Sequence, residues 1–368
     1  MRSDILDTLK IVLVTFVFTA AIMPIMKKIA IHIGAVDVPR KDEGNRHIHK
    51  RVVPKLGALG IYLGFLFGYM LFGQQSIQMN SILIGSFVVV LTGLVDDIKE
   101  IRAYQKMLGQ LAASAVIVFY GGILLNNITA FGFSIDFGVF AYPITMLFIV
   151  ACCNIINLID GLDGLSGGVC SIFYLTIGII GFYQARSGSL VMILTFIMLG
   201  STLGFLLHNF YPAKIFAGDC ATFMGFIISI ITLLEFKGPA LTSFFVPLLI
   251  LGIPILDTAF AIVRRMLKRQ PIFSADKQHL HHQLLGMNFS QRTTVLIIYG
   301  MNILFAMASI LYTIKDPVLG QILYIIIFII VLWFVFHTSI ISDKSPKLTK
   351  KLKDKIKLSS KSKKKKKK

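Results

Sequence analysis

The chain has 368 residues, of which 55% are hydrophobic and only 15% are charged. Soluble domains carry charge on about a quarter of their residues, so the composition argues against a soluble enzyme and against a nucleic-acid-binding domain. The formal net charge is +19, because 37 basic residues outnumber 18 acidic ones. The apolar stretches are continuous rather than alternating, which favours membrane-spanning helices over a β-barrel.

Eleven apolar stretches recur along the chain, and a helix of this length can cross a hydrocarbon core of about 30 Å. We therefore predict an all-α polytopic membrane protein, with one transmembrane catalytic domain over residues 1–341. Two of the stretches, 80–95 and 221–236, are short for a membrane span. The predicted spans are 8–26, 56–73, 80–95, 107–124, 137–153, 166–184, 189–207, 221–236, 239–262, 294–314 and 318–340.

Basic residues are concentrated in alternate loops between the predicted spans. The segments 27–55 and 263–293 are rich in Lys and Arg, whereas 74–79 and 125–136 have none. Because short basic loops stay on the cytoplasmic side, the N-terminus is predicted outside and the C-terminus inside. Residues 342–368 form a Lys-rich cytoplasmic tail that ends in KSKKKKKK, and such a like-charge block is predicted to be disordered.

Unusual polar residues gather in five stretches, all on this predicted cytoplasmic side. In chain order the stretches are HIHKRVVPKLG, LVDDIKE, NIINLIDGLDGLSGG, NFYPAKIFAGDCATF and ADKQHLHHQLL. Each follows or precedes a predicted span, and the predicted outer loops contain no comparable cluster. The candidate functional residues are Lys50, Asp96, Asp97, Asn154, Asn157, Asp160, Asp163, Asn209, Asp219, His279, His281 and His282.

Each motif taken alone has a simpler interpretation. Adjacent Asp96 and Asp97 at a helix end are either solvated or share a cation, such as Lys or Mg²⁺. A single Asp at a helix start, as expected for Asp219, is often a cap. Lys50 alone is explained mostly as one of the basic residues that keep a loop on the cytoplasmic side. The three histidines fit a solvated loop, a structural zinc site or contact with an anion, although zinc would need thiolates or better-spaced partners.

The glycines of DGLDGLSGG are predicted to interrupt the helix after the fifth span. Gly161, Gly164, Gly167 and Gly168 would break the helix and expose backbone N–H groups. At membrane depth, a broken helix with bare polar groups is tolerated only where it is buried in protein or lines a cavity. We therefore expect a polar cavity that opens to the cytoplasm. Its carboxylates, amides and basic groups fit a divalent metal with phosphates best.

The motifs DD, NxxNxxDGxDGL, AKIFAGD and HLHH, in this order within residues 35–300, resemble those of the polyprenyl-phosphate N-acetylhexosamine-1-phosphate transferase family. The resemblance implies that undecaprenyl phosphate attacks the β-phosphorus of a UDP-N-acetylhexosamine, with N-acetylglucosamine the expected sugar. UMP leaves, and the lipid-linked product starts a cell-envelope glycan. The resemblance also implies Mg²⁺, or Mn²⁺ in its place.

The same resemblance implies a location and partners. The enzyme would lie in the bacterial cytoplasmic (inner) membrane, with its active site facing the cytoplasm. Its expected partners are the UDP-sugar, undecaprenyl phosphate and the lipid bilayer, and nucleic acid is not among them. A homodimer is compatible with the resemblance.

The resemblance assigns roles to individual residues. Asp219 and Asn157 would bind Mg²⁺ at the diphosphate, and Asp163 would recognise the uracil base. The remaining assignments are Asp96 and Asp97 beside the attacking phosphate, Lys50 as the basic residue before the second span, Asn154, Asp160 and Asn209 in the substrate pocket, and His279, His281 and His282 on the sugar phosphate or diphosphate.

Two other functions share some of these sequence features. The phospho-N-acetylmuramoyl-pentapeptide transferases share the superfamily, but they usually have three consecutive histidines and then an acidic residue. Here Leu280 interrupts the histidines and Gln283 follows them. Ala58, Ala217, Cys220 and Ala221 depart from the family pattern, which leaves the exact sugar open. A transporter would also contain intramembrane acids, but it would place them near the midplane and show a repeat, and we find neither.

We predict that residue 277 is cytoplasmic, because it lies in the basic segment 263–293. A Lys277→Cys variant should resist a membrane-impermeant thiol reagent in intact cells and react after permeabilisation. Ser76→Cys, in the predicted outer segment 74–79, is the matched control that should react in intact cells. Efficient labelling of Lys277→Cys from outside would contradict the topology.

Overall fold

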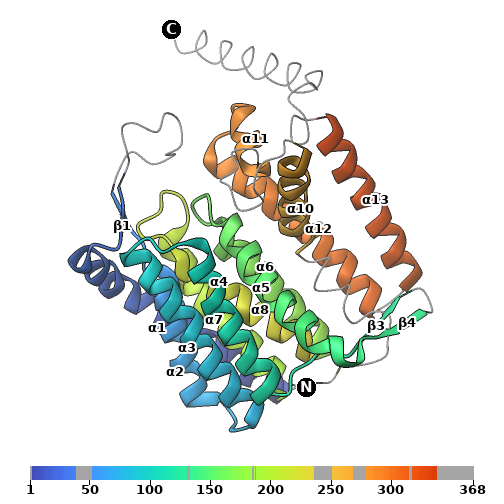
Figure 1. Cartoon of the computed structure of the whole chain (residues 1–368), viewed down its shortest axis with the longest axis horizontal. Helices are drawn as coiled ribbons and strands as arrows, with labels where there is room; N and C mark the ends of the chain where they lie inside the picture. The colour runs from blue at the N-terminus through green and yellow to red at the C-terminus, as the bar shows by residue number, and fades with distance from the viewer. Residues whose placement is uncertain are drawn as a thin grey trace. The chain divides into compact units, whose positions relative to one another are not determined.

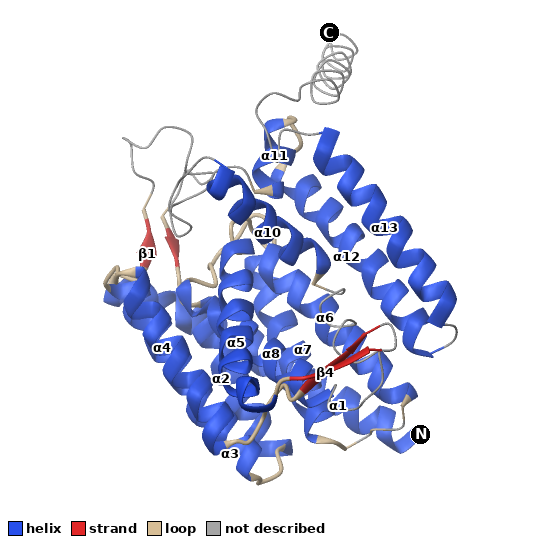
Figure 2. Cartoon of the chain, turned by 45° about the vertical axis from the view of Figure 1, so that its right-hand side comes forward, coloured by secondary structure: helices blue, strands red, loops and turns tan. Residues whose placement is uncertain are grey.

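The structure, a computed structural model, describes residues 2–38, 52–130, 133–184, 186, 188–235, 251–267, 279–314 and 317–337. It is largely helical, with two small antiparallel strand pairs (Figures 1 and 2). Backbone contacts divide the chain into two compact units, Met1–Ile250 and Leu251–Lys368, which we describe separately. The helical fold was predicted correctly. The single domain over 1–341 stays a prediction, and Lys50 and the tail 342–368 lie outside the described residues.

The helices of the first unit follow the predicted spans closely. They are α1 (Arg2–Ile33), α2 (Gly57–Phe72), α3 (Ile77–Ile98), α4 (Ala103–Ala115), α5 (Ala141–Ile159), α6 (Leu165–Tyr183), α7 (Leu190–Asn209) and α8 (Thr222–Glu235). The π-helical segment η2 (Val116–Tyr120) extends α4, and the 3₁₀ turns η3 (Gly138–Phe140) and η4 (Asp219–Ala221) lead into α5 and α8. The strand pairs are β1 (Val36–Asp37) with β2 (Val53–Pro54), and β3 (Asn127–Ala130) with β4 (Phe133–Asp136).

The second unit consists of α10 (Gly252–Leu267), α11 (Leu280–Gly286), α12 (Gln291–Ile314) and α13 (Pro317–His337). Within this unit α12 packs against the other three helices. The predicted span 239–262 is matched only from Gly252 onward, because 239–250 lies outside the described residues. The short helix α11 stands where the sequence predicted a loop.

Six helices in the described part of the chain are long and apolar enough to cross a membrane. Three further apolar helices, Gly57–Phe72, Gly252–Val263 and Val318–Ile330, are shorter. By length and composition the chain is therefore a multi-pass membrane protein. The six are Ile5–Ile33, Ile77–Ile98, Gly138–Ile159, Leu165–Tyr183, Leu190–Asn209 and Gln291–Ile314.

Helix α8 lies at the centre of the first unit, where it packs against α2, α3, α5 and α7. All of its residues except Leu234 are buried, as expected of a helix that is apolar on every side. Its last residue, Glu235, has a fully buried side chain that pairs with Arg186 at 2.9 Å between Oε1 and Nη1. Since a buried charge is costly without a partner, this ion pair secures the end of the central helix.

The helix break between α5 and α6 is shorter than predicted. It covers Asp160–Gly164, and Gly164 adopts φ of +82°, a conformation that favours glycine. Gly167 and Gly168 were predicted to extend the break, but both lie inside α6. A Cβ atom on Gly167 would lie 3.3 Å from the ring of Phe205, so this glycine allows α6 and α7 to pack closely.

A second close approach joins α3 to η4, the turn that carries Asp219. A Cβ atom on Gly93 would lie 2.7 Å from Cα of Cys220 and 2.9 Å from the carbonyl oxygen of Asp219. Both of these are backbone atoms, which cannot rotate aside as a flexible side chain can. The absence of a side chain at position 93 therefore sets how closely α3 approaches Asp219.

We predict that Gly93→Ala destabilises the protein by about 1–3 kcal/mol, because the methyl group overpacks against the backbone. The melting temperature in detergent measures the effect. Gly300→Ala is the matched control: it also lies in a helix, and apart from its chain neighbours and the nearby backbone of that helix, no atom of the described residues lies within 4 Å of its Cβ position. The control should be neutral or slightly stabilising. Equal melting temperatures for the two variants would contradict the close approach.

Candidate functional site

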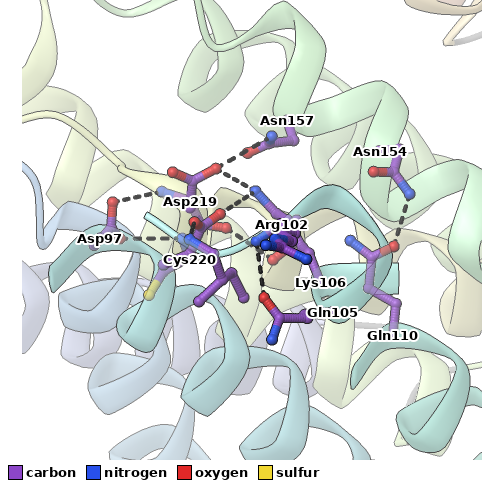
Figure 3. A network of polar contacts seen from close by, with 12 residues as sticks. Asp97, Arg102, Gln105, Lys106, Gln110, Asn154, Asn157, Asp219 and Cys220 are labelled. Carbon is purple, nitrogen blue, oxygen red and sulfur yellow. Dashed lines mark hydrogen bonds and ion pairs between the residues drawn. The ribbon is translucent and has the colours of Figure 1, made fainter. Parts of the chain in front are cut away.

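Four element ends meet at one end of the first unit and bring together polar residues that are far apart in sequence (Figure 3). Helix α3 ends just after Asp96 and Asp97, and α4 carries Lys106 in its first turn. Asn157 lies in the last turn of α5, and Asp219 opens η4. The sequence predicted that Asp96, Asp97, Asn157 and Asp219 lie on one face, and the structure brings these four together.

Lys106 is the centre of this cluster, because its ammonium group pairs with two carboxylates. It lies 3.1 Å from Oδ2 of Asp96 and also contacts Oδ1 of Asp219. The Asn157 amide donates to the same Asp219 oxygen at 3.5 Å. The side chains of Lys106 and Asp96 are 14% and 13% exposed, whereas that of Asp219 is 31% exposed. Asp219 is thus the carboxylate that solvent or a ligand reaches most readily.

Asp97 differs from its neighbour Asp96, because it holds the backbone of η4. Its Oδ1 accepts a hydrogen bond from the backbone N–H of Asp219 at 2.9 Å, and its Oδ2 accepts one from Cys220 at 3.4 Å. Gly218 has φ of +76°, and a Cβ atom there would lie 2.5 Å from Oδ2 of Asp97. The glycine of AGD therefore allows the turn and leaves room for this carboxylate, which fixes Asp219 in place. The predicted position of Asp97 beside a substrate phosphate stays a prediction.

Asp160 ends α5 at the edge of the helix break, and its Oδ1 accepts a hydrogen bond from Ser166. Loss of hydration raises the pKa of the Asp160 carboxyl to about 7, although the Ser166 hydrogen bond acts in the opposite direction. A carboxyl that titrates near neutral pH can donate as well as accept a hydrogen bond. Asp160 therefore has a different chemistry from an ordinary exposed aspartate.

Asp163 and Asn209 join the helix break to the segment after α7. The Asp163 Oδ2 accepts a hydrogen bond from the backbone N–H of Ala213 at 2.9 Å. The Asn209 Oδ1 accepts one from the N–H of Gly164 at 2.9 Å, and its amide donates to the carbonyl of Ile215 at 2.8 Å. Both side chains are buried. They brace the backbone in this structure, and their contacts with substrate stay predictions.

Asn154, one turn before Asn157, binds α4 instead of the acidic cluster. Its amide donates to Oε1 of Gln110 at 2.7 Å (Figure 3). It also donates to the carbonyl of Val150 at 2.8 Å. This side-chain pair ties α5 to α4, the helix that carries Lys106. Asn154 therefore supports the cluster from the side.

The three histidines lie in the second unit, at the start of α11. The ring of His281 stacks on that of His279 with centroids 5.8 Å apart, and it lies 4.3 Å from that of His282. His279 and His281 are buried, which argues against the solvated loop among the three interpretations of these histidines. Burial, followed by the charge of His282, lowers the pKa of His281 to about 3. His281 is therefore neutral near pH 7.

Sequence reasoning missed two residues that the structure connects to these groups. Lys106 follows Lys99 and Arg102 in a short basic stretch and so carries no signal of its own, yet it bridges Asp96 and Asp219. Asp257 on α10 lies outside the five polar stretches, and its Oδ2 lies 3.1 Å from Nδ1 of His279. The available signal was a lone acid inside an apolar stretch, which in a membrane segment indicates a function or a partner.

The residues around Lys106 include oxygen ligands of the kind that Mg²⁺ takes. No group of three His, Cys, Asp or Glu side chains in the described ranges converges closely enough to hold a metal alone. Mg²⁺, however, is commonly bound by one or two carboxylates together with substrate phosphates and waters. Asp96 and Asp219 already direct oxygens at one shared cation, the Lys106 ammonium. They are the residues here that fit Mg²⁺ best, with the Asn157 amide beside them.

Comparison with known proteins identifies the family. The model of glycosyl transferase family 4 matches residues 79–235, which run from α3 to α8 and contain the whole acidic cluster. A probable undecaprenyl-phosphate N-acetylglucosaminyl 1-phosphate transferase of Bacillus subtilis is 39% identical over 348 residues, covering 92% of this chain and 94% of that protein. A decaprenyl-phosphate N-acetylglucosaminephosphotransferase of Mycobacterium tuberculosis is 30% identical, covering 79% of this chain and 80% of that protein.

A third relative, the undecaprenyl-phosphate alpha-N-acetylglucosaminyl 1-phosphate transferase of Escherichia coli, is 28% identical over 77% of this chain and 78% of its own length. These relatives extend beyond the region matched by the family model. The chain belongs to the polyprenyl-phosphate N-acetylglucosamine-1-phosphate transferases of glycosyl transferase family 4. The resemblance noted in the sequence is therefore confirmed.

We predict that Lys106→Met lowers the free energy of unfolding by about 1–3 kcal/mol, because it leaves two neighbouring carboxylates without their shared cation. A double-mutant cycle with Asp219→Asn, followed by melting in detergent, should give a coupling of about 0.5–3 kcal/mol. The control is Lys10→Met, which breaks a pair whose side chains are both 68% exposed and should change little. Additive losses at positions 106 and 219 would contradict the pairing.

Proposed function

We propose that this protein transfers N-acetylglucosamine 1-phosphate from UDP-N-acetylglucosamine to undecaprenyl phosphate. An oxygen of the lipid phosphate bonds to the β-phosphorus, the bond between that phosphorus and the bridging oxygen breaks, and UMP leaves. The product is a lipid diphosphate sugar that initiates a cell-envelope glycan. The observation that carries this proposal is the 39% identity to the Bacillus subtilis transferase across 92% of the chain.

The charges of the site support this chemistry. Both substrates are phosphate anions, so they need cations beside the acidic cluster. When bound through Asp219, Asp96 and Asn157, Mg²⁺ would stabilise negative charge on the diphosphate. Lys106 neutralises the carboxylates and supplies a second cation that can pair with a phosphate oxygen. Asp97 acts indirectly in this proposal, because it holds the Asp219 backbone.

A strong base is not required of the aspartates. The second pKa of a phosphate monoester is near 6, so the attacking lipid phosphate is already largely ionised at neutral pH. Orientation of two anions and compensation of their charge are then the main contributions of the protein. This fits a cluster in which most carboxylate oxygens are held by hydrogen bonds or ion pairs.

The remaining assignments concern the sugar nucleotide. Asp163 is proposed to recognise the uracil base. The pocket around the base is proposed to be shaped by Asn154, Asp160 and Asn209. The histidines of α11 are proposed to bind the sugar phosphate or diphosphate, and Lys50 to serve as a further cation. The hydrogen bonds of Asp163 and Asn209 within the protein support a role in holding the pocket backbone.

We also propose the finer topology. The chain crosses the bacterial cytoplasmic membrane eleven times, with the N-terminus outside and the C-terminus inside. The lopsided distribution of Lys and Arg supports this orientation. It puts the ends of α3 and α5, and with them the acidic cluster, on the side where nucleotide sugars are available.

The purified protein should release UMP from UDP-N-acetylglucosamine only when undecaprenyl phosphate and Mg²⁺ are present. UDP-muramoyl-pentapeptide should be a poor donor, because HLHH departs from the motif of that branch. Release of UMP and formation of the lipid product are measured in parallel for a panel of UDP-sugars. Asp219→Asn should slow turnover by about 10²-fold or more.

Two results would contradict the proposal. The first is efficient transfer from UDP-muramoyl-pentapeptide with none from UDP-N-acetylglucosamine. The second is near-normal turnover by Asp219→Asn at low Mg²⁺. The Lys10→Met variant, whose exposed pair is remote from the cluster in sequence, is the control for purification and reconstitution.

A further inference from the structure

Asp257 is a buried carboxylate on α10 that holds both His279 and the start of α11. Its Oδ2 lies 3.1 Å from Nδ1 of His279, and its Oδ1 accepts a hydrogen bond from the backbone N–H of Leu280 at 2.8 Å. The side chains of Asp257 and His279 are each only 7% exposed. One carboxylate thus fixes the side chain of a candidate functional residue and the backbone that follows it.

This geometry determines which ring nitrogen of His279 carries hydrogen. A carboxylate only accepts hydrogen bonds, so the close Nδ1 must be the donor. The other nitrogen, Nε2, is then the one left to meet a ligand. Carboxylates hold functional histidines in this manner in metal sites and in hydrolase triads, where they fix the tautomer and stabilise the imidazolium form.

The three histidines are consequently not equivalent. His279 has a carboxylate partner, whereas His281 is buried with its ring parallel to that of His279, the planes differing by 2°. The stacking restricts the rotation of the His279 ring further. His282 is the most exposed of the three histidines.

We propose that Asp257 is a positioning residue that sets the orientation and tautomer of His279, so that Nε2 of His279 contacts a phosphate oxygen of the sugar nucleotide. The contact with phosphate rests on the proposed function, whereas the Asp257–His279 pair stands on the geometry alone. In the bound state His279 is an imidazolium that donates from Nδ1 to Asp257 and from Nε2 to the phosphate. Asp257 itself does not touch the substrate.

Asp257→Asn tests the proposal with little change of shape. The amide oxygen can still accept from Leu280, but the amide nitrogen would then face Nδ1 of His279 as a donor. The ring must switch tautomer, and the charge that supports the imidazolium is lost. We expect kcat/KM to fall about tenfold or more, because a charge-assisted hydrogen bond becomes a neutral one.

A double-mutant cycle separates positioning from a general structural role. If Asp257 acts through His279, the double variant Asp257→Asn with His279→Gln should be no slower than His279→Gln alone. The matched control is Thr258→Val, the next residue on α10, whose buried hydroxyl has no hydrogen-bond partner among the residues that the structure describes. It should retain normal activity and a normal melting temperature. Additive losses in the cycle, or normal activity of Asp257→Asn, would overturn the proposal.

A second measurement does not depend on turnover. In protein labelled with ¹⁵N-histidine, the His279 signals, assigned by their loss in His279→Gln, should report hydrogen on Nδ1 in the unmodified protein and on Nε2 in Asp257→Asn. Hydrogen on Nε2 alone in the unmodified protein would refute the pair even if the variant does not fold. If the protein does not transfer N-acetylglucosamine 1-phosphate, the proposed function fails, and the phosphate contact of His279 fails with it. The ¹⁵N measurement still shows whether His279 donates from Nδ1 to Asp257.

Discussion

The site of the first unit depends on one shared cation, because Lys106 pairs with both Asp96 and Asp219. These carboxylates come from the end of α3 and the start of η4, and two unpaired acids would repel each other at the edge of an apolar bundle. The ammonium group removes that repulsion and joins α3, α4 and η4. A divalent cation bound with a substrate phosphate is positively charged, as the ammonium group is, and can pair with the same carboxylate oxygens. The ion pair therefore keeps the acidic cluster assembled in the absence of ligand.

The close packing around this ion pair relies on small residues and on backbone hydrogen bonds. Gly93 lets α3 approach η4, and Gly218 makes the turn that aims two backbone N–H groups at Asp97. The buried helix α8 follows directly and packs against α3 and α5. Asp219 thus projects from a turn that is held from several sides. Such support is what a phosphate-binding or metal-binding carboxylate needs, because small displacements cost much of its effect.

The polar residues of NIINLIDGLDGLSGG have unequal roles in the structure. Asn157 belongs to the acidic cluster, Asn154 ties α5 to α4, and Asp163 braces the segment after α7. At the edge of a membrane a polar side chain without a partner would be costly, so most of these groups bond within the protein. A motif recognised as a whole therefore contains both a residue of the acidic cluster and residues that support the surrounding helices. The two kinds are distinguished by their hydrogen-bond partners.

The sequence alone determined the helical membrane fold, most of the span positions and the grouping of Asp96, Asp97, Asn157 and Asp219, because hydropathy and loop charge are local properties. It also predicted the family, which depends on the order of short motifs. Only the tertiary structure revealed that Lys106 meets Asp219 across 113 positions and that Asp257 holds His279 across 22. Their positions along the chain do not identify these partners: Lys106 is one of several basic residues in its loop, and a lone Asp in an apolar stretch indicates that a partner exists but not which residue it is. Helix packing decided these partners, because it brings together side chains whose separation along the chain is arbitrary.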